Sequence, residues 1–161
     1  MTLLPLILPF AVLTLCAMHD ASRFKIPNRY VAVLLAGWAP VAWATGVPLE
    51  VAGLSAAMAG VILLVGFGMF AFNLLGAGDV KLLAATALWV GPAQMPVFLI
   101  ATTFLGALLG IALMRMRSVP LPAFAMGTGW LVQLHERDRV MPYGVAIAGG
   151  AMIALWRGAV G

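Results

Sequence analysis

Two aspartates, Asp20 and Asp79, stand where a carboxylate is costly to place. Asp79 ends an uncharged run that begins at Val51, and Asp20 directly follows the first apolar segment of the chain. A carboxylate at the edge of a bilayer is rare unless it is paired, hydrated or functional, because its desolvation is unfavourable. The chain has only five acidic residues. Their placement predicts a pair of carboxyl groups that act together.

A pair of neighbouring carboxyl groups can hydrolyse a peptide bond. One carboxylate takes a proton from water, and the other group, as the acid, protonates the scissile carbonyl. Ionisation of both neighbouring carboxyl groups is unfavourable because their negative charges repel, so the pair is expected to share one proton. Gly76 and Gly78 precede Asp79 and would let the backbone turn and lie close to an extended substrate. Lys81 either holds Asp79 ionised or extends to lipid headgroups, and the second role is preferred.

The composition indicates a membrane protein. The chain has 161 residues, of which 64% are hydrophobic and 9% are charged, whereas a soluble domain carries about 25% charged residues. We therefore expect a single integral-membrane domain over residues 1–161. The net charge of +4 is attributed to cytoplasmic loops in contact with anionic lipids, and not to nucleic-acid binding. Cys16 is the single cysteine and His19 and His135 lack metal-ligand spacing, so neither a metal nor a cofactor is expected.

Hydropathy and helix breakers predict an all-α bundle of six transmembrane helices. Four spans are expected over residues 3–18, 30–45, 51–72 and 140–156. The uncharged stretch from Leu82 to Met114 is too long for one span, and Gly91, Pro92 and Pro96 are expected to break it. This leaves a short fourth helix that begins near Asp79 and a fifth over residues 93–114. Residues 121–135 are expected to form an interfacial helix.

The distribution of basic residues predicts the orientation of the bundle. No positive charge precedes the first apolar segment, so we expect a retained helix and not a secretory signal. With six spans and both termini outside, Arg157 alone among the nine basic residues lies outside the cytoplasm. Asp20 and Asp79 would then lie on the same, cytoplasmic, side of the membrane and could meet.

Three short motifs resemble those of the prepilin peptidases, which are aspartic proteases of the Gly-x-Gly-Asp type. The first is Gly-Ala-Gly-Asp-Val-Lys-Leu-Leu around Asp79. The second is Asp20 followed six residues later by Ile-Pro-Asn, which includes Pro27 and Asn28. The third is Pro142-Tyr143-Gly144, which is similar to the start of the family's last helix. Locally, Pro27 should stop the loop from continuing a helix, and Asn28 should offer a capping oxygen for the second helix.

The resemblance implies an activity and a substrate. Asp20 and Asp79 would be the catalytic pair of a leader peptidase in a bacterial or archaeal cytoplasmic membrane. Its substrate would be a prepilin, cut after a glycine that ends a short basic leader. The length resembles the short, tight-adherence (Flp) pilus branch. Longer members carry an N-terminal cysteine-containing domain that is not found here, so N-methyltransferase activity is not expected.

Alternative interpretations exist for each motif. Asp20 alone suits a solvated acid at a helix end, and Asp79 alone suits a helix N-cap. The pair could also serve a small proton- or ion-coupled carrier as a relay, although the inverted repeat that carriers often show is not found. Gly106 and Gly110 have the small-x-x-x-small spacing of close helix contacts, as do the pairs Gly53/Ala57 and Ala56/Gly60. We expect these contacts inside one bundle, and the oligomeric state stays open.

Overall fold

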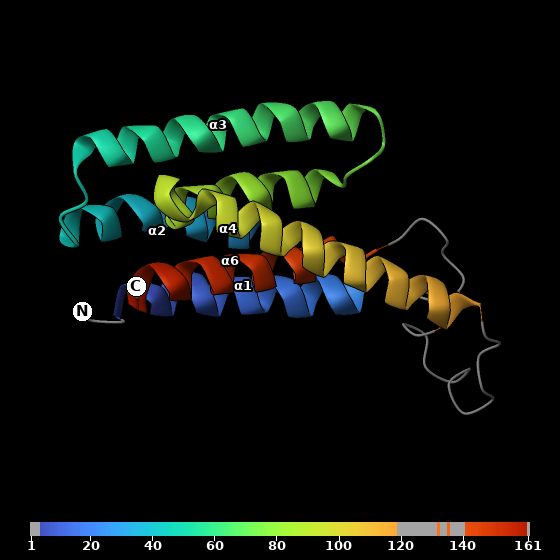
Figure 1. The fold of residues 1–161 in the computed structure, drawn as a ribbon. Coiled ribbons are helices and arrows are strands. Elements are labelled where there is room, and N and C mark those ends of the chain that lie inside the picture. Colours follow the sequence, from blue (N-terminus) through green and yellow to red (C-terminus); the bar gives the residue numbers. More distant parts are fainter. Residues whose placement is uncertain (1–3, 119–131, 133–134, 136–140, 161) are drawn as a thin grey trace.

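The computed structural model describes residues 4–118, 132, 135 and 141–160. Within these residues the chain forms five helices, which confirms the all-α class (Figure 1). Their bounds are α1 Leu4–Arg23, α2 Asn28–Ala44, α3 Leu49–Ala71, α4 Ala77–Arg117 and α6 Tyr143–Val160. The predicted interfacial helix over residues 121–135 lies almost wholly outside the described residues.

The prediction of a six-helix bundle is wrong. In the described part of the chain, four helices are long and apolar enough to cross a membrane, namely α1, α3, α4 and α6. The predicted fourth and fifth helices are two arms of α4, residues 77–90 and residues 92–117, joined at Gly91 with φ 69° and ψ 173°. Glycine adopts this positive φ at no steric cost. Pro92 follows at the start of the second arm, where a missing N–H leaves no intrahelical bond unmade.

Gly91 makes the chain reverse its direction, so the two arms of α4 run in opposite senses (Figure 1). The first arm starts beside the end of α3, where Val80 meets Gly66, and ends near Ser55 of the same helix. The second arm runs antiparallel to α6, from the pair Gln94–Gly158 to the pair Gly106–Tyr143. The start of α1 and the end of α6 therefore lie at one end of the bundle, and the starts of α2, α4 and α6 lie at the other (Figure 1).

Small residues let α4 and α6 cross closely. A Cβ atom added at Gly150 would lie 2.7 Å from the backbone nitrogen of Thr102, and one added at Gly106 would lie 2.7 Å from the Tyr143 ring. The predicted internal contact is thus confirmed at Gly106. It is wrong for Gly53 and Gly60 in α3, because an added Cβ there would meet nothing within 4 Å.

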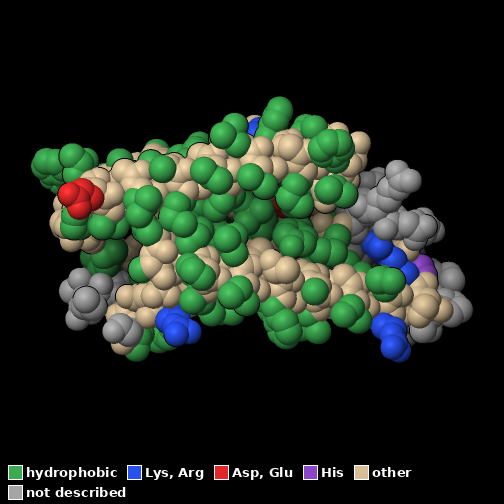
Figure 2. Space-filling view, turned by 45° about the horizontal axis from the view of Figure 1, so that its top comes forward, with side chains coloured by type: hydrophobic (Ala, Val, Ile, Leu, Met, Phe, Trp, Pro, Cys, Tyr) green, Lys and Arg blue, Asp and Glu red, His purple; other side chains and the backbone are tan. Residues whose placement is uncertain are grey.

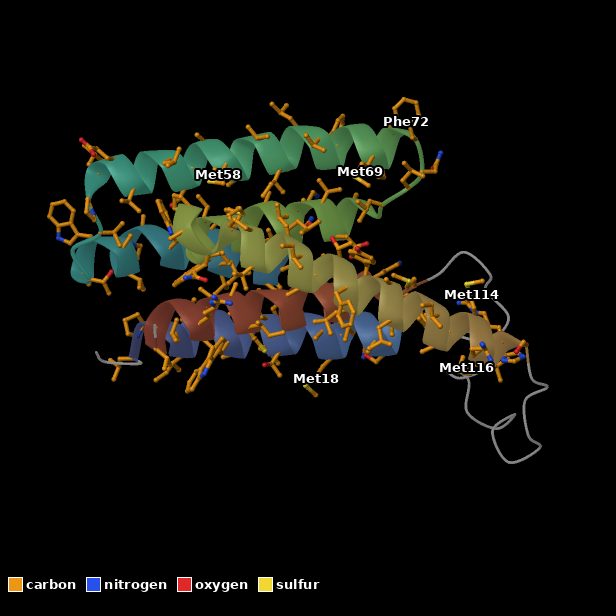
Figure 3. The ribbon with its side chains drawn as sticks, viewed as in Figure 1. Met18, Met58, Met69, Phe72, Met114 and Met116 are labelled. Carbon is orange, nitrogen blue, oxygen red and sulfur yellow. The ribbon has the colours of Figure 1, made fainter. Side chains whose placement is uncertain are left out.

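The core is apolar and so is most of the outer surface. Leu13, Leu34, Leu82, Phe98 and Ile147 are fully buried. On the face drawn in Figure 2, hydrophobic side chains cover the middle and charged side chains lie mainly towards the ends. Large apolar side chains such as Met18 and Phe72 point away from the bundle (Figure 3). An apolar exterior of this kind belongs in lipid, and the chain is a multi-pass membrane protein.

The connection between α1 and α2 is shorter than predicted. The first predicted span ends at residue 18, before Asp20, but α1 continues to Arg23, and the backbone N–H of Phe24 still donates to the carbonyl of Asp20 at 2.8 Å. Phe24 then adopts φ 53°, a left-handed conformation that ends a helix. Only residues 24–27 remain between the two helices. Asp20 is therefore fixed on a rigid element.

Candidate active site

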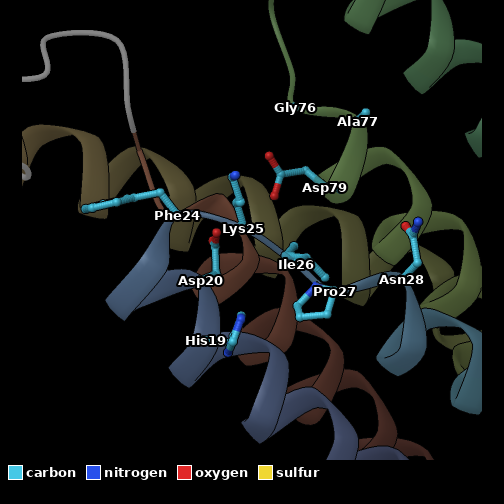
Figure 4. Close-up of a pocket in the computed structure, with 11 residues that line it drawn as sticks. His19, Asp20, Phe24, Lys25, Ile26, Pro27, Asn28, Gly76, Ala77 and Asp79 are labelled. Atoms are coloured by element: carbon cyan, nitrogen blue, oxygen red, sulfur yellow. The ribbon is translucent and has the colours of Figure 1, made fainter.

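A cavity of about 560 Å³ opens between the end of α1, the start of α2 and the start of α4 (Figure 4). It brings together residues from two of the three predicted motifs. The predicted residues that line it are Asp20, Pro27, Asn28, Gly76, Gly78 and Asp79. The remaining lining residues are His19, Phe24, Lys25, Ile26 and Ala77.

Asp20 is held by the first turn of α6. Its side chain is buried, with 5% of its surface exposed, and its Oδ2 atom accepts a hydrogen bond of 2.8 Å from the backbone N–H of Gly144. A Cβ atom on residue 144 would lie 2.8 Å from the same oxygen, so only glycine allows this approach. The unpaired N–H groups of a helix start favour a negative charge, and Asp20 is placed to benefit from them.

Asp79 is held by the first turn of its own helix. Gly76 is the N-cap of α4, which makes Asp79 the third helical residue, and its carboxyl accepts a hydrogen bond from the backbone N–H of Gly76. This is the acidic half of a capping box. The alternative interpretation of Asp79 as the N-cap itself is wrong by three positions. Each carboxyl group is thus oriented by a backbone N–H at the start of a helix.

The two carboxyl groups point into the same cavity and interact electrostatically (Figure 4). Ile26 packs between the helix starts that hold them. Its Cβ lies 3.3 Å from where a Cβ of residue 78 would be, and its Cδ1 lies 3.0 Å from where one of residue 144 would be. Gly78 and Gly144 therefore let α4 and α6 close on the same side chain. The arrangement suits two acids that share one proton beside a water-accessible space.

The third motif supports the site without lining the cavity. Pro142 is buried, and its carbonyl accepts a hydrogen bond from the backbone N–H of Val145 at 3.2 Å, which starts α6. The ring of Tyr143 packs on the bare backbone of Gly106 in the second arm of α4. Tyr143 therefore fixes the start of α6, and Gly144 next to it reaches Asp20.

The predicted capping role of Asn28 is wrong. The N-cap of α2 is Pro27, with φ −63° and ψ 133° and no side-chain cap hydrogen bond. The Oδ1 atom of Asn28 accepts instead a hydrogen bond of 3.3 Å from Nζ of Lys81. Lys81, for which contact with lipid headgroups was the preferred prediction, is thus tied across to α2. Sequence reasoning missed this pair because 53 positions separate its members.

Five cavity residues were not among the predicted site residues, and three of them, His19, Phe24 and Lys25, also stand outside the residues quoted for the motifs. The ring of His19 meets that of Tyr30 edge to face, with centroids 6.0 Å apart. Phe24 carries a positive φ without being glycine, a strained backbone conformation that proteins often keep at functional sites. Their position in the sequence could have predicted them as cavity residues, because all three lie within five residues of Asp20 along the chain.

Comparison with known proteins identifies the class. The profile of the type IV leader peptidase family matches residues 7–111. A protein of Aeromonas salmonicida (strain A449) named prepilin leader peptidase/N-methyltransferase is 30% identical over 161 residues, which cover 96% of this chain and 49% of that protein. A protein of the same name from Aeromonas hydrophila is 32% identical over 105 residues, which cover 62% of this chain and 30% of that protein.

The chain belongs to the type IV leader peptidase family. It spans about half the length of the Aeromonas salmonicida relative. No solved structure matches it. The profile match includes Asp20, Asp79 and the whole lining of the cavity, while the third motif lies beyond it.

Proposed function

We propose that this protein is a membrane-embedded aspartic endopeptidase that removes the short basic leader from prepilins of the tight-adherence (Flp) type. The observation that carries the proposal is the meeting of Asp20 and Asp79 in one cavity, each held by a backbone N–H at a helix start. Membership of the leader peptidase family favours this function over the carrier alternative.

The proposed reaction is the addition of water to the carbonyl of the scissile peptide bond. Asp20 and Asp79 hold one proton between them. The ionised carboxylate takes a proton from water as the oxygen attacks, and the protonated partner donates its proton to the carbonyl oxygen. Collapse of the tetrahedral intermediate returns a proton to the leaving amine and restores the shared proton. The fixed carboxyl groups need little reorganisation during these steps, which lowers the barrier.

We propose that the cavity faces the cytoplasm. Among the lysines and arginines that the structure describes, all except Arg157 belong to the end of the bundle that carries the cavity. They are Arg23, Lys25, Arg29, Lys81, Arg115 and Arg117. The positive-inside rule places such an end in the cytoplasm. A basic leader stays on that side, and the apolar helix that follows it enters the bilayer beside the bundle.

The test is cleavage of a purified prepilin by the protein in liposomes, with Asp20→Asn, Asp79→Asn and the double variant. Each single change removes half of the proton-sharing pair, so each should abolish cleavage while membrane insertion is kept. The double variant should lose no more than either single one, because the two groups act as a unit. Glu50→Gln removes an exposed carboxylate at the start of α3, at the opposite end, and should cleave normally. Full activity in either single aspartate variant would end the proposal.

The substrate is tested with a second precursor in which a bulky residue replaces the glycine before the cleavage site. Glycine disfavours helix by about 1 kcal/mol relative to alanine, so it helps the junction to open into the extended form that a protease binds. The natural precursor should be cut at this glycine and the bulky variant should resist. Equal cleavage of both, or cleavage within the apolar helix, would indicate a general intramembrane protease instead.

A further inference from the structure

A second hollow, of about 320 Å³, lies between α2, α3 and the first arm of α4. We name it the apolar groove. Its walls are almost wholly hydrocarbon. The residues that define it here are Val31 and Leu35 from α2, Ala59 and Gly60 from α3, and Ala84 and Leu88 from α4. Neither the catalytic steps nor the three motifs account for this groove.

The groove is shaped for one side of a helix. Its α3 and α4 walls consist mainly of alanine and glycine, and strips of small residues are what lets helices approach closely in membranes. Gly60 is open, since a Cβ atom added there would meet nothing within 4 Å. A lipid acyl chain bends to fit any apolar surface, whereas a helix about 10 Å across needs such a strip. The lining therefore favours a helical occupant.

The groove begins where the catalytic cavity ends. Lys81 lines the groove, and its amine donates to Oδ1 of Asn28 at 3.3 Å, a residue that lines the catalytic cavity. From Lys81 to Leu88 the wall follows the first arm of α4 for seven residues, which is roughly 10 Å at the helical rise. The groove thus runs from beside the cavity towards the opposite end of the bundle.

We propose that the apolar groove seats the apolar helix of the substrate, so that the peptide bond before that helix enters the cavity between Asp20 and Asp79. This inference rests on the proposed leader peptidase function. The substrate chain would be extended where it crosses the catalytic cavity and helical where it lies in the apolar groove. Contact with the groove should stabilise the bound substrate and the transition state equally. It should therefore lower KM and leave kcat largely unchanged.

The first experiment fills the groove. Gly60→Leu places a side chain in open space within the lining, and Gly53→Leu does the same on α3 outside the lining, so neither should disturb the fold. Two substrates are compared, the full precursor and a soluble peptide that keeps the leader and the scissile bond but ends a few residues beyond it. Gly60→Leu should raise KM for the precursor on the order of tenfold, the discrimination that a size change in an apolar pocket gives. It should leave cleavage of the short peptide unchanged, and Gly53→Leu should change neither.

The second experiment locates the helix directly. A photo-crosslinking amino acid replaces Leu63, which lines the groove, in an Asp20→Asn variant that holds the precursor without cutting it. Val61 on the exposed surface of the same helix is the control position. Crosslinks from position 63, but not from position 61, to the apolar helix of the precursor would support the proposal.

Several outcomes would overturn the inference. Equal KM values for Gly60→Leu and Gly53→Leu would show that the substrate does not use the groove, and crosslinks to lipid alone would assign it to an acyl chain. A loss on the short peptide as well would mean that Gly60→Leu acts through the catalytic site. Failure of the unaltered protein to cut either substrate would instead reject the leader peptidase function itself.

Discussion

The hydrogen bond between Gly144 and Asp20 offers the sharpest test of the site. In Gly144→Ala the new methyl carbon would lie 2.8 Å from Oδ2 of Asp20, which is 0.6 Å short of the 3.4 Å at which ordinary contact begins. Sideways movement is blocked, because Cδ1 of Ile26 would lie 3.0 Å away and Cβ of Asp20 itself 3.1 Å away. The carboxyl group must therefore retreat from α6 and loses its hydrogen bond.

We expect kcat of Gly144→Ala to fall by about 100-fold, the loss that a misplacement of about 1 Å of a catalytic group produces. The fold should persist, because alanine favours a helix over glycine by about 1 kcal/mol. The assay is cleavage of a prepilin in liposomes, with thermal unfolding measured on the same preparations.

Gly149→Ala is the matched control for Gly144→Ala. Its added carbon also lies 2.8 Å from a neighbour in the same helix interface, but that neighbour is Cδ1 at the mobile end of Leu105. A leucine side chain can turn away, so activity should stay near that of the unaltered protein. Wild-type kcat in Gly144→Ala would refute the argument that α6 positions Asp20.

Three further predictions address the orientation of the protein in the membrane, the role of Lys81, and whether the protein methylates the cleaved pilin. A membrane-impermeant thiol reagent added outside intact cells should label Thr45→Cys and not Ser22→Cys, with little background because Cys16 is buried; the reverse pattern would invert the topology. Lys81→Ala should lower activity only about two- to threefold, because it removes one exposed hydrogen bond to Asn28; complete loss would give Lys81 a catalytic role. Mass spectrometry of pilin cleaved by this chain with a methyl donor present should show an unmethylated new N-terminus, and a methylated one would contradict the proposed restriction to hydrolysis.

The sequence located the apolar segments better than it predicted the helix count. Hydropathy and charge located the apolar segments, and a break was expected at Gly91 and Pro92, where the kink is found. The count failed for two reasons. One glycine at positive φ joins two predicted helices without a loop, and α2, which corresponds to the predicted span over residues 30–45, has only 17 residues and is not among the helices long enough to cross a membrane. Hydropathy records how long a segment is, and it does not record whether two helices are joined through one residue. The end of α1 was missed for a related reason, since Asp20 is polar but remains in the helix.

Short sequence motifs did not predict the contacts that form between helices across the bundle. The motifs predicted that Asp20 and Asp79 would meet, and they line one cavity. The partners that orient them are set by tertiary packing. Asn28 looked like a helix cap in its own segment, yet its oxygen is used by Lys81. Nothing in the sequence predicted that the ring of Tyr143 packs on Gly106.

The bond between Gly144 and Asp20 joins positions 124 residues apart, and this separation has a consequence for biosynthesis. Both aspartates emerge from the ribosome before the turn of α6 that orients Asp20. A nascent chain therefore carries both acids without a completed catalytic pair. We expect the proposed proteolytic activity to begin only after α6 has been inserted.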